Sequence, residues 1–296
     1  MQKAILKTGN VTAVNNQGSN SFTLQTPSMI IQFRLKPLKT DILALANEIY
    51  GDLVPKVNFH DGFPLPVYSS KVIPGQVHMF QPFSKEFPLE REKTTVTELS
   101  LFIARAAFFE QPKANAKNDS WTNTAPEMLH RLVQNNTLKV YAPELFEVIC
   151  RLQHQVHLLE SLPRVLTHHD LSQVNILVSD AGKITGVIDF DEAGVEAFGM
   201  CIWGLYECFF GSMEAGKWSL YHEMPVLANA FWESLWANIP PSLKREEAEK
   251  AVKVSLSIGV LNRYFIEGMV DEIDLSKRVH RESLEYAKGI LPRIWE

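Results

Sequence analysis

The sequence predicts an α+β fold in which a β-rich N-terminal part is followed by a larger, mainly helical part. Three observations lead to this prediction. Apolar and polar residues alternate in short runs up to about residue 75, which is typical of half-buried strands. Beyond this point, apolar residues recur with the 3.6-residue period of amphipathic helices. A segment with strand-like runs, residues 165–192, interrupts the helical part.

Length and composition are those of a globular protein. The chain has 296 residues, of which 46% are hydrophobic and 21% are charged, enough to bury a large core in one domain or in two lobes. The N-terminal residues contain no apolar run long enough for a signal peptide, and no run approaches the roughly 18 residues of a membrane span. We therefore expect a cytoplasmic protein with no membrane partner, whose three cysteines are free thiols.

Charge is unevenly distributed along the chain. Residues 1–179 carry 17 Lys and Arg against 15 Asp and Glu, a net charge of +2, whereas residues 180–296 carry 12 against 19, a net charge of −7. An acidic C-terminal part disfavours nucleic acid as a partner and permits a cationic small molecule.

The segment 165–192, VLTHHDLSQVNILVSDAGKITGVIDFDE, contains the side chains that most clearly indicate a chemical function. It is predicted to form strand, polar loop, strand, tight turn and strand, and to end in acidic residues. The loop places Asp170 and Asn175 five residues apart, and the following hairpin returns Asp189 beside them. Two carboxylates and an amide in one small volume suit a divalent metal ion and a phosphate. In a phosphoryl transfer, Asp170 would accept the proton of a hydroxyl, and Asn175 and Asp189 would hold Mg²⁺.

This segment resembles the catalytic loop shared by aminoglycoside phosphotransferases, choline kinases and protein kinases. His168, Asp170 and Asn175 match the pattern H-x-D-L-x-x-x-x-N, and Ile188-Asp189-Phe190-Asp191 resembles the metal-binding segment. The chain departs from the pattern at His169, where a small residue is common, and at Asp191, where protein kinases have Gly. The resemblance implies that Asp170 is the catalytic base, with His168 in a structural role.

The resemblance also implies a two-lobed, protein kinase-like fold. Residues 1–75 would form a small nucleotide-binding lobe, an antiparallel β-sheet with one helix, because I-P-G at residues 73–75 resembles the end of that lobe in the family. Residues 76–296 would form the larger, mainly helical catalytic and substrate lobe. The segment AFGMCIWGLYECFFG, within residues 194–211, is predicted to be a buried helix and is similar to that of filamentous-fungal members.

Candidate nucleotide-binding residues lie in the N-terminal part. A small polar loop precedes the first alternating strand and is similar to the family's phosphate-covering loop; it consists of Gly18, Ser19, Asn20 and Ser21. Arg34, on the strand 29–35, corresponds to the cation that pairs with the α and β phosphates, with Lys36 on the same face as the alternative.

Two further features complete the nucleotide-binding prediction. The pattern TDILALANEIY predicts a helix that Thr40 caps and Gly51 ends, and on which Glu48 would pair with Arg34. The backbone near Lys71 and Ile73 would bind the adenine edge, as the resemblance implies.

Helices are predicted through most of the C-terminal part. Thr94 or Thr95 is expected to open one helix, residues 126–132 to form a shorter one, and Pro143 to start a long one that leads to the loop. The last three helices, near residues 220–236, 244–266 and 275–290, would form the acceptor wall. Aromatic candidates for stacking on a substrate are Trp218, Trp232, Trp236 and Tyr264, although core packing is the commoner role for such residues.

The residues therefore predict a kinase that transfers the γ-phosphate of ATP or GTP to a hydroxyl of a small molecule. One alternative is a weak or inactive kinase-fold protein that binds nucleotide. Another is a metal-dependent phosphohydrolase that uses the His169-Asp170 doublet with His154 or His157, although such doublets lie on helices. The sequence does not specify the acceptor or the oligomeric state.

Overall fold

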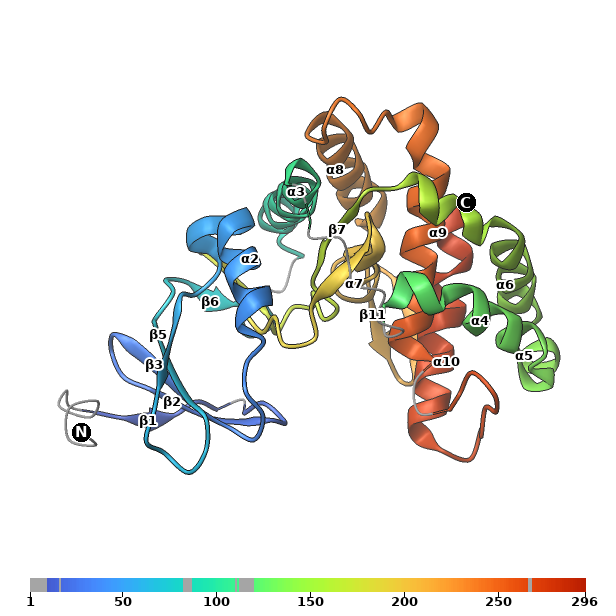
Figure 1. Ribbon diagram of the computed structural model, residues 1–296. Coiled ribbons are helices and arrows are strands. Elements are labelled where there is room, and N and C mark those ends of the chain that lie inside the picture. The colour runs from blue at the N-terminus through green and yellow to red at the C-terminus, as the bar shows by residue number, and fades with distance from the viewer. Residues whose placement is uncertain (1–9, 16, 82–86, 110, 112–119, 266–267) are drawn as a thin grey trace.

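The computed structural model describes residues 10–15, 17–81, 87–109, 111, 120–265 and 268–296. An antiparallel sheet lies at one end of the molecule and a helical body at the other (Figure 1). The sheet has the strand order β1-β2-β3-β5-β4. Its strands are β1 (Thr12–Ala13), β2 (Ser21–Gln25), β3 (Met29–Arg34), β4 (Val57–His60) and β5 (Val67–Lys71). This arrangement confirms the predicted α+β class, with an antiparallel N-terminal sheet and a mainly helical C-terminal part.

Helix α2 (Thr40–Tyr50) joins the sheet to the rest of the molecule. Its buried positions recur at helical spacing, and its last residue, Tyr50, stacks on Phe102 with ring centroids 3.9 Å apart. Gly51 ends the helix with φ 61°, as predicted. Thr40 was wrongly predicted as the cap: the capping position is Lys39, and Thr40 is already the first helical residue.

Seven helices, which are six to twenty residues long, form most of the remaining described chain. They are α3 (Leu89–Arg105), α4 (Trp121–Val133), α5 (Asn136–Tyr141), α6 (Pro143–Gln155), α8 (Met224–Ala237), α9 (Arg245–Tyr264) and α10 (Arg278–Ile290). Pro143 does start a helix, but α3 begins five residues before Thr94 because Leu89 and Glu92 are already packed inside. Helix α4 is also longer than predicted and contains Pro126 in its second turn.

Two small sheets hold the segment predicted to carry the chemistry. Strand β7 (Arg164–Thr167) pairs with β10 (Gly194–Ala197), and β8 (Ile176–Val178) lies between β6 (Gln76–Val77) and β9 (Ile184–Val187). The strand, loop, hairpin and returning strand are therefore as predicted.

The buried helix predicted within 194–211 was largely wrong. The segment begins as strand β10, breaks at Gly199, where φ is 93°, and contains only the short helix α7 (Trp203–Cys208). An unpredicted hairpin follows, formed by β11 (Gly211–Glu214) and β12 (Lys217–Leu220). Strand pairing with β7 overrides the apolar pattern, which cannot by itself distinguish a buried strand from a buried helix.

The core is continuous from α2 through the helical body, and its largest fully buried side chains include Trp203, Phe198 and Phe231. The three cysteines are free thiols. Within the described ranges, no helix has the length and apolar character that a membrane crossing requires.

Candidate functional site

The loop between β7 and β8 holds Asp170 and Asn175 in direct contact. The side-chain amide of Asn175 donates to the backbone carbonyl of Asp170 and to its carboxylate Oδ2, both at 2.8 Å. A turn at Ser172, whose carbonyl accepts from the Asn175 N–H at 3.0 Å, brings the two residues together. Asn175 uses its Nδ2 for these bonds, and no hydrogen bond to its Oδ1 is found among the described residues.

His168 fixes this loop to the next strand. Its Nε2 lies 2.8 Å from the carbonyl of Ile188, and its Nδ1 accepts the backbone N–H of Asp170 at 3.2 Å. The ring is buried, and burial lowers the pKa of His168, although the Ile188 carbonyl and nearby carboxylates oppose the change. A neutral ring with its proton on Nε2 satisfies both contacts. The geometry fits the structural role predicted for His168.

Asp189 lies beside the same loop. The N–H of Ile188 donates to the carbonyl of Asn175 at 2.9 Å, so the two backbones meet one residue before Asp189. Asp189 has φ 64°, a left-handed conformation that is unfavourable for residues other than Gly and is common at functional sites. Burial raises its pKa, an effect that His168 and Arg34 oppose and that the carboxylates of Asp170 and Glu192 increase.

Oxygen ligands for a divalent cation are available at this position. Among the described residues, neither the Asp189 carboxylate nor Asn175 Oδ1 accepts a hydrogen bond. A carboxylate whose pKa is raised by its surroundings and by a second carboxylate is stabilised in its ionised form by a nearby cation. Mg²⁺ prefers such hard oxygen ligands, so the predicted pair fits this ion. In the described ranges, no group of three or more His, Cys, Asp or Glu side chains could hold a metal ion.

Arg34 reaches this cluster from the sheet, but with a different partner from the one predicted. Its guanidinium forms an ion pair and hydrogen bond with Asp191, and its Nε donates to the carbonyl of Lys36 at 3.3 Å. The predicted Arg34–Glu48 pair was wrong: no such ion pair exists in the described residues, and Glu48 is exposed on α2. Asp191, where protein kinases have Gly, lies closer to the end of β3 and takes the guanidinium.

The polar loop lies next to Arg34. Ser21, the first residue of β2, pairs with Arg34 in the sheet, and the carbonyl of Asn20 accepts the N–H of Leu35 at 2.9 Å. The four predicted loop residues, Gly18, Ser19, Asn20 and Ser21, therefore adjoin the arginine.

The predicted adenine-edge residues lie at the other end of the same strands. Lys71 pairs with Met29, five residues from Arg34 along β3, and its side chain is exposed. Ile73 packs against Gly186 of β9, where an added Cβ would lie 2.8 Å from the isoleucine side chain. The structure thus separates Lys71 and Ile73 from the loop and Arg34.

The opposite side of Asp170 faces a pocket of about 250 Å³. Its lining residues are Trp121, His169, Asp170, Glu192, Asn262 and Arg263. Arg263, on α9, places its guanidinium 3.3 Å from Asp170 Oδ1 and 3.7 Å from a carboxylate oxygen of Glu207. Sequence reasoning missed Arg263 and Trp121, because each lies on a helix far from the loop in sequence and neither belongs to a recognised motif.

His169, next to the predicted base Asp170, is held by contacts with Trp121 and Glu196. Its ring stacks on Trp121, with centroids 3.9 Å apart and planes 6° apart, and its Nε2 lies 3.4 Å from Glu196 Oε1. Gly194 lies against the ring, since a Cβ there would be 3.3 Å from His169 Cε1. The departure from a small residue at 169 is therefore accommodated by this glycine, and the side chain packs between Trp121 and Glu196.

Glu196 anchors the start of α4 from within β10. Its buried carboxylate accepts hydrogen bonds of 2.6 to 2.9 Å from the Ser120 hydroxyl, the N–H groups of Trp121 and Thr122, and the Thr122 hydroxyl. Burial alone would raise the pKa of Glu196, but these bonds and His169 outweigh it and lower the pKa. The carboxylate thereby holds Trp121 against the pocket.

The four aromatic residues predicted to stack on a substrate do not line this pocket. Trp218 is buried against Gly211 and Gly289, and Trp232 and Trp236 stack on each other. Tyr264 is buried and donates its hydroxyl to Glu207 at 2.5 Å. All four therefore have a packing role in this structure.

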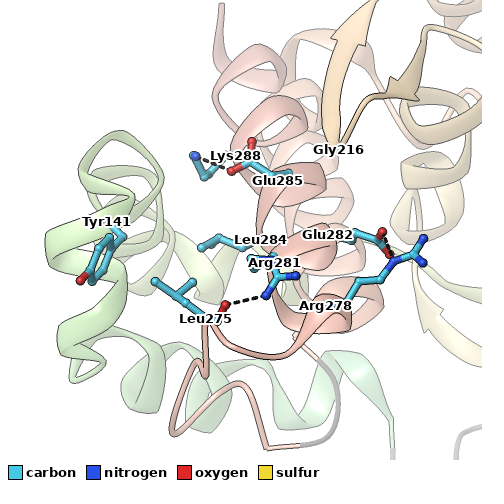
Figure 2. Close-up of a pocket in the computed structure, with 9 residues that line it drawn as sticks. All are labelled: Tyr141, Gly216, Leu275, Arg278, Arg281, Glu282, Leu284, Glu285 and Lys288. Atoms are coloured by element: carbon cyan, nitrogen blue, oxygen red, sulfur yellow. Dashed lines mark hydrogen bonds and ion pairs between the residues drawn. The ribbon is translucent and has the colours of Figure 1, made fainter.

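A larger hollow, of about 510 Å³, lies at α10, away from these residues (Figure 2). Most of its charged groups are paired with each other, as in Arg278 with Glu282 and Lys288 with Glu285. Arg281 donates to the backbone carbonyls of Leu275 and Ser276. None of the predicted site residues lines this hollow.

Comparison with known proteins agrees with the predicted resemblance. Residues 100–206, which contain the loop, match the model of the "Phosphotransferase enzyme family". No curated protein matches the chain in sequence. The resemblance to aminoglycoside phosphotransferases is thus confirmed, while similarity to fungal members stays a prediction.

Solved structures share the fold across almost the whole chain. The ternary complex of APH(2″)-IIa with streptomycin and ATP has a TM-score of 0.54 at 14% identity and covers 97% of this chain and 93% of its own. The macrolide 2′-phosphotransferase of Brachybacterium faecium has a TM-score of 0.55 at 16% identity, covering 95% and 92%. The ethanolamine kinase of Plasmodium vivax has a TM-score of 0.55 at 13% identity, covering 94% and 80%. The chain therefore has the fold of these phosphotransferases.

Proposed function

We propose that this protein is a small-molecule kinase, which transfers the γ-phosphate of ATP or GTP to a hydroxyl group of its acceptor. The observation that supports the proposal is that Asn175 hydrogen-bonds to Asp170 within one loop, while the backbone one residue before Asp189 hydrogen-bonds to Asn175. The fold and the match of residues 100–206 support the same reaction class.

Each residue has a defined role in this reaction. Asp170 orients the acceptor hydroxyl and takes its proton as the oxygen attacks the γ-phosphorus; the bond from that phosphorus to the β-γ bridging oxygen breaks. Asn175 keeps the Asp170 carboxylate in place with one end of its amide, and its Oδ1 and the Asp189 carboxylate would hold Mg²⁺. The metal, when bound, neutralises charge on the phosphates. His168 fixes the loop.

The donor would lie between the sheet and the loop. Gly18, Ser19, Asn20 and Ser21 would cover the phosphates, and Arg34 would leave Asp191 to pair with them. The adenine edge would meet the backbone near Lys71 and Ile73. We also propose the boundary near residue 75 between a nucleotide-binding lobe and a catalytic lobe. One of the related structures contains ATP, which makes ATP the first donor to test.

The acceptor would enter from the opposite side, through the pocket of about 250 Å³ that Trp121 and Arg263 line. A hydroxyl in this pocket can approach Asp170 directly. The pocket carries the carboxylates of Asp170 and Glu192 beside one guanidinium, so it admits a polar acceptor, including a cationic one.

The test begins with thermal shift in Mg-ATP and Mg-GTP, followed by measurement of nucleotide consumption across a library of hydroxylated acceptors. We expect a raised melting temperature with one nucleotide and acceptor-dependent formation of the diphosphate. Asp170→Ala is the matched control, since it removes the base and leaves the metal-binding pair intact. Nucleotide binding without transfer to any acceptor would support the inactive, nucleotide-binding alternative and contradict the proposal.

A further inference from the structure

We propose that Arg263 is a positioning residue that holds the carboxylate of Asp170 from the acceptor side. This inference rests on the proposed function, because it concerns the base of that reaction. The residue lies 93 positions after Asp170 on a different element, helix α9, and belongs to no motif found in the sequence.

The two carboxylate oxygens of Asp170 have different surroundings. Oδ2 accepts a hydrogen bond from the Asn175 amide at 2.8 Å. Oδ1 is shielded from solvent and accepts no hydrogen bond within the described part of the chain, but the Arg263 guanidinium lies 3.3 Å away. A shielded carboxylate oxygen without a hydrogen bond is costly. The guanidinium supplies the compensating charge and, together with Asn175, fixes the plane of the carboxylate.

Contacts with Trp203 and Glu207 hold the side chain of Arg263 in place. Its guanidinium carbon lies 4.8 Å from the centre of the buried Trp203 ring, and its Nε lies 3.7 Å from Glu207. Glu207 in turn accepts the hydroxyl of Tyr264 at 2.5 Å. A side chain whose exposed fraction is 37% would otherwise sample several rotamers. These contacts give the guanidinium a single direction, towards Asp170.

This arrangement predicts a particular kinetic effect. If Arg263 orients the base, its loss misplaces the attacking hydroxyl and lowers kcat, while nucleotide binding on the other side of Asp170 is unchanged. Misplacement by about 1 Å can lower a rate by about 100-fold. A role in folding alone would instead lower the melting temperature and would not depend on whether residue 170 is a carboxylate.

The experiment compares Arg263→Met and Arg263→Lys with Arg245→Met. Methionine keeps the apolar stem that packs on Trp203. Arg245 is a matched control, because it lies on the same helix, faces Trp236 at 5.8 Å and pairs with Glu249, but contacts no site residue. We expect kcat to fall about 10- to 100-fold in Arg263→Met, to fall less in Arg263→Lys, and to stay within about twofold in Arg245→Met.

Two further measurements separate positioning from a structural role. In the Asp170→Asn background, Arg263→Met should cost at most about twofold, because an interaction that acts through the carboxylate is already lost. Added guanidinium at millimolar concentration should restore part of the kcat of Arg263→Ala. Wild-type kcat in Arg263→Met, or an equal loss in both backgrounds, overturns the inference while the proposed function stands. Absence of transfer by the wild-type chain overturns both.

Discussion

Two arginines contact the segment 165–192, one from the sheet and one from the helical body. Arg34 extends from strand β3 of the sheet to Asp191, and Arg263 extends from helix α9 to Asp170. The side chain of Arg34 has an exposed fraction of 5%, against 37% for Arg263. The first arginine lies on the proposed nucleotide side and the second on the proposed acceptor side.

The two arginines differ in how they could be found: the sequence pattern predicts Arg34, whereas only the folded structure reveals Arg263. The position of Arg34 on its strand could be predicted, but its partner could not, because Asp191 is 157 residues away. A buried ion pair carries a large desolvation cost and is released only in exchange for another strong partner, such as a phosphate. Arg263 is partly hydrated, so less desolvation free energy is involved in forming or breaking its contact with Asp170.

The largest effect is expected from the residues between the two arginines. Asp170→Ala should lower kcat by about 10²- to 10⁴-fold, the usual contribution of a general base, and leave the Kd for Mg-nucleotide within about twofold. Asp189→Ala should instead weaken Mg-nucleotide binding itself, measured by calorimetry. Loss of nucleotide binding in Asp170→Ala would show that the aspartate is structural, and unchanged affinity in Asp189→Ala would contradict the metal assignment.

An intermediate effect is expected when the two arginines are replaced in turn. Arg34→Met should raise the Kd for nucleotide about tenfold, which corresponds to one charge-assisted hydrogen bond to phosphate. Arg263→Met should leave that Kd within about twofold.

Asp191→Asn tests how the ion pair between Arg34 and Asp191 affects nucleotide binding. Release of Arg34 from its ion pair should lower the nucleotide Kd by roughly threefold, since less interaction has to be broken before the phosphates bind. Weaker binding in Asp191→Asn, to the extent seen in Arg34→Met, would indicate that the pair itself builds the site.

The smallest effect is expected at Glu196, which anchors the start of α4 beside the proposed acceptor pocket. Glu196→Gln should lower the free energy of unfolding at pH 7 by about 1–3 kcal/mol, because its donors lose a charged acceptor. The folded pKa of Glu196 lies below its ordinary value of 4.5. Its stabilisation is therefore complete above pH 4.5 and is lost as pH falls through that value towards the folded pKa.

Chemical denaturation at several pH values would measure this effect. The difference in unfolding free energy between wild type and Glu196→Gln should narrow as pH falls from 6 to below 4. Glu233→Gln, at an exposed position on α8, is the control and should show no such change. A difference that stays constant with pH would argue against an ionised Glu196.

The sequence allowed prediction of the loop more fully than of its surroundings. Asp170, Asn175 and His168 lie within eight residues of one another, so spacing and turn chemistry determine how they meet. The same local rules placed Gly51 at the end of α2 and Pro143 at the start of α6.

Long-range partners could not be read from local patterns. The contacts of Arg34 with Asp191 and of Arg263 with Asp170 depend on how the sheet and α9 pack against the loop. Periodicity also failed for residues 194–211, where most positions are apolar and the pattern is compatible with either a helix or a strand. Pairing with β7 decides the outcome there, because Glu196 then reaches the first residues of α4.

The fit between Gly194 and the His169 ring has an evolutionary consequence. A methyl group at residue 194 would lie 3.3 Å from the imidazole, so the ring, which stacks on Trp121, would have to shift slightly to accommodate it. Relatives that keep histidine at 169 should therefore keep glycine at 194, whereas those with a small residue at 169 are free to vary at 194. The two positions, which are 25 residues apart, should change together.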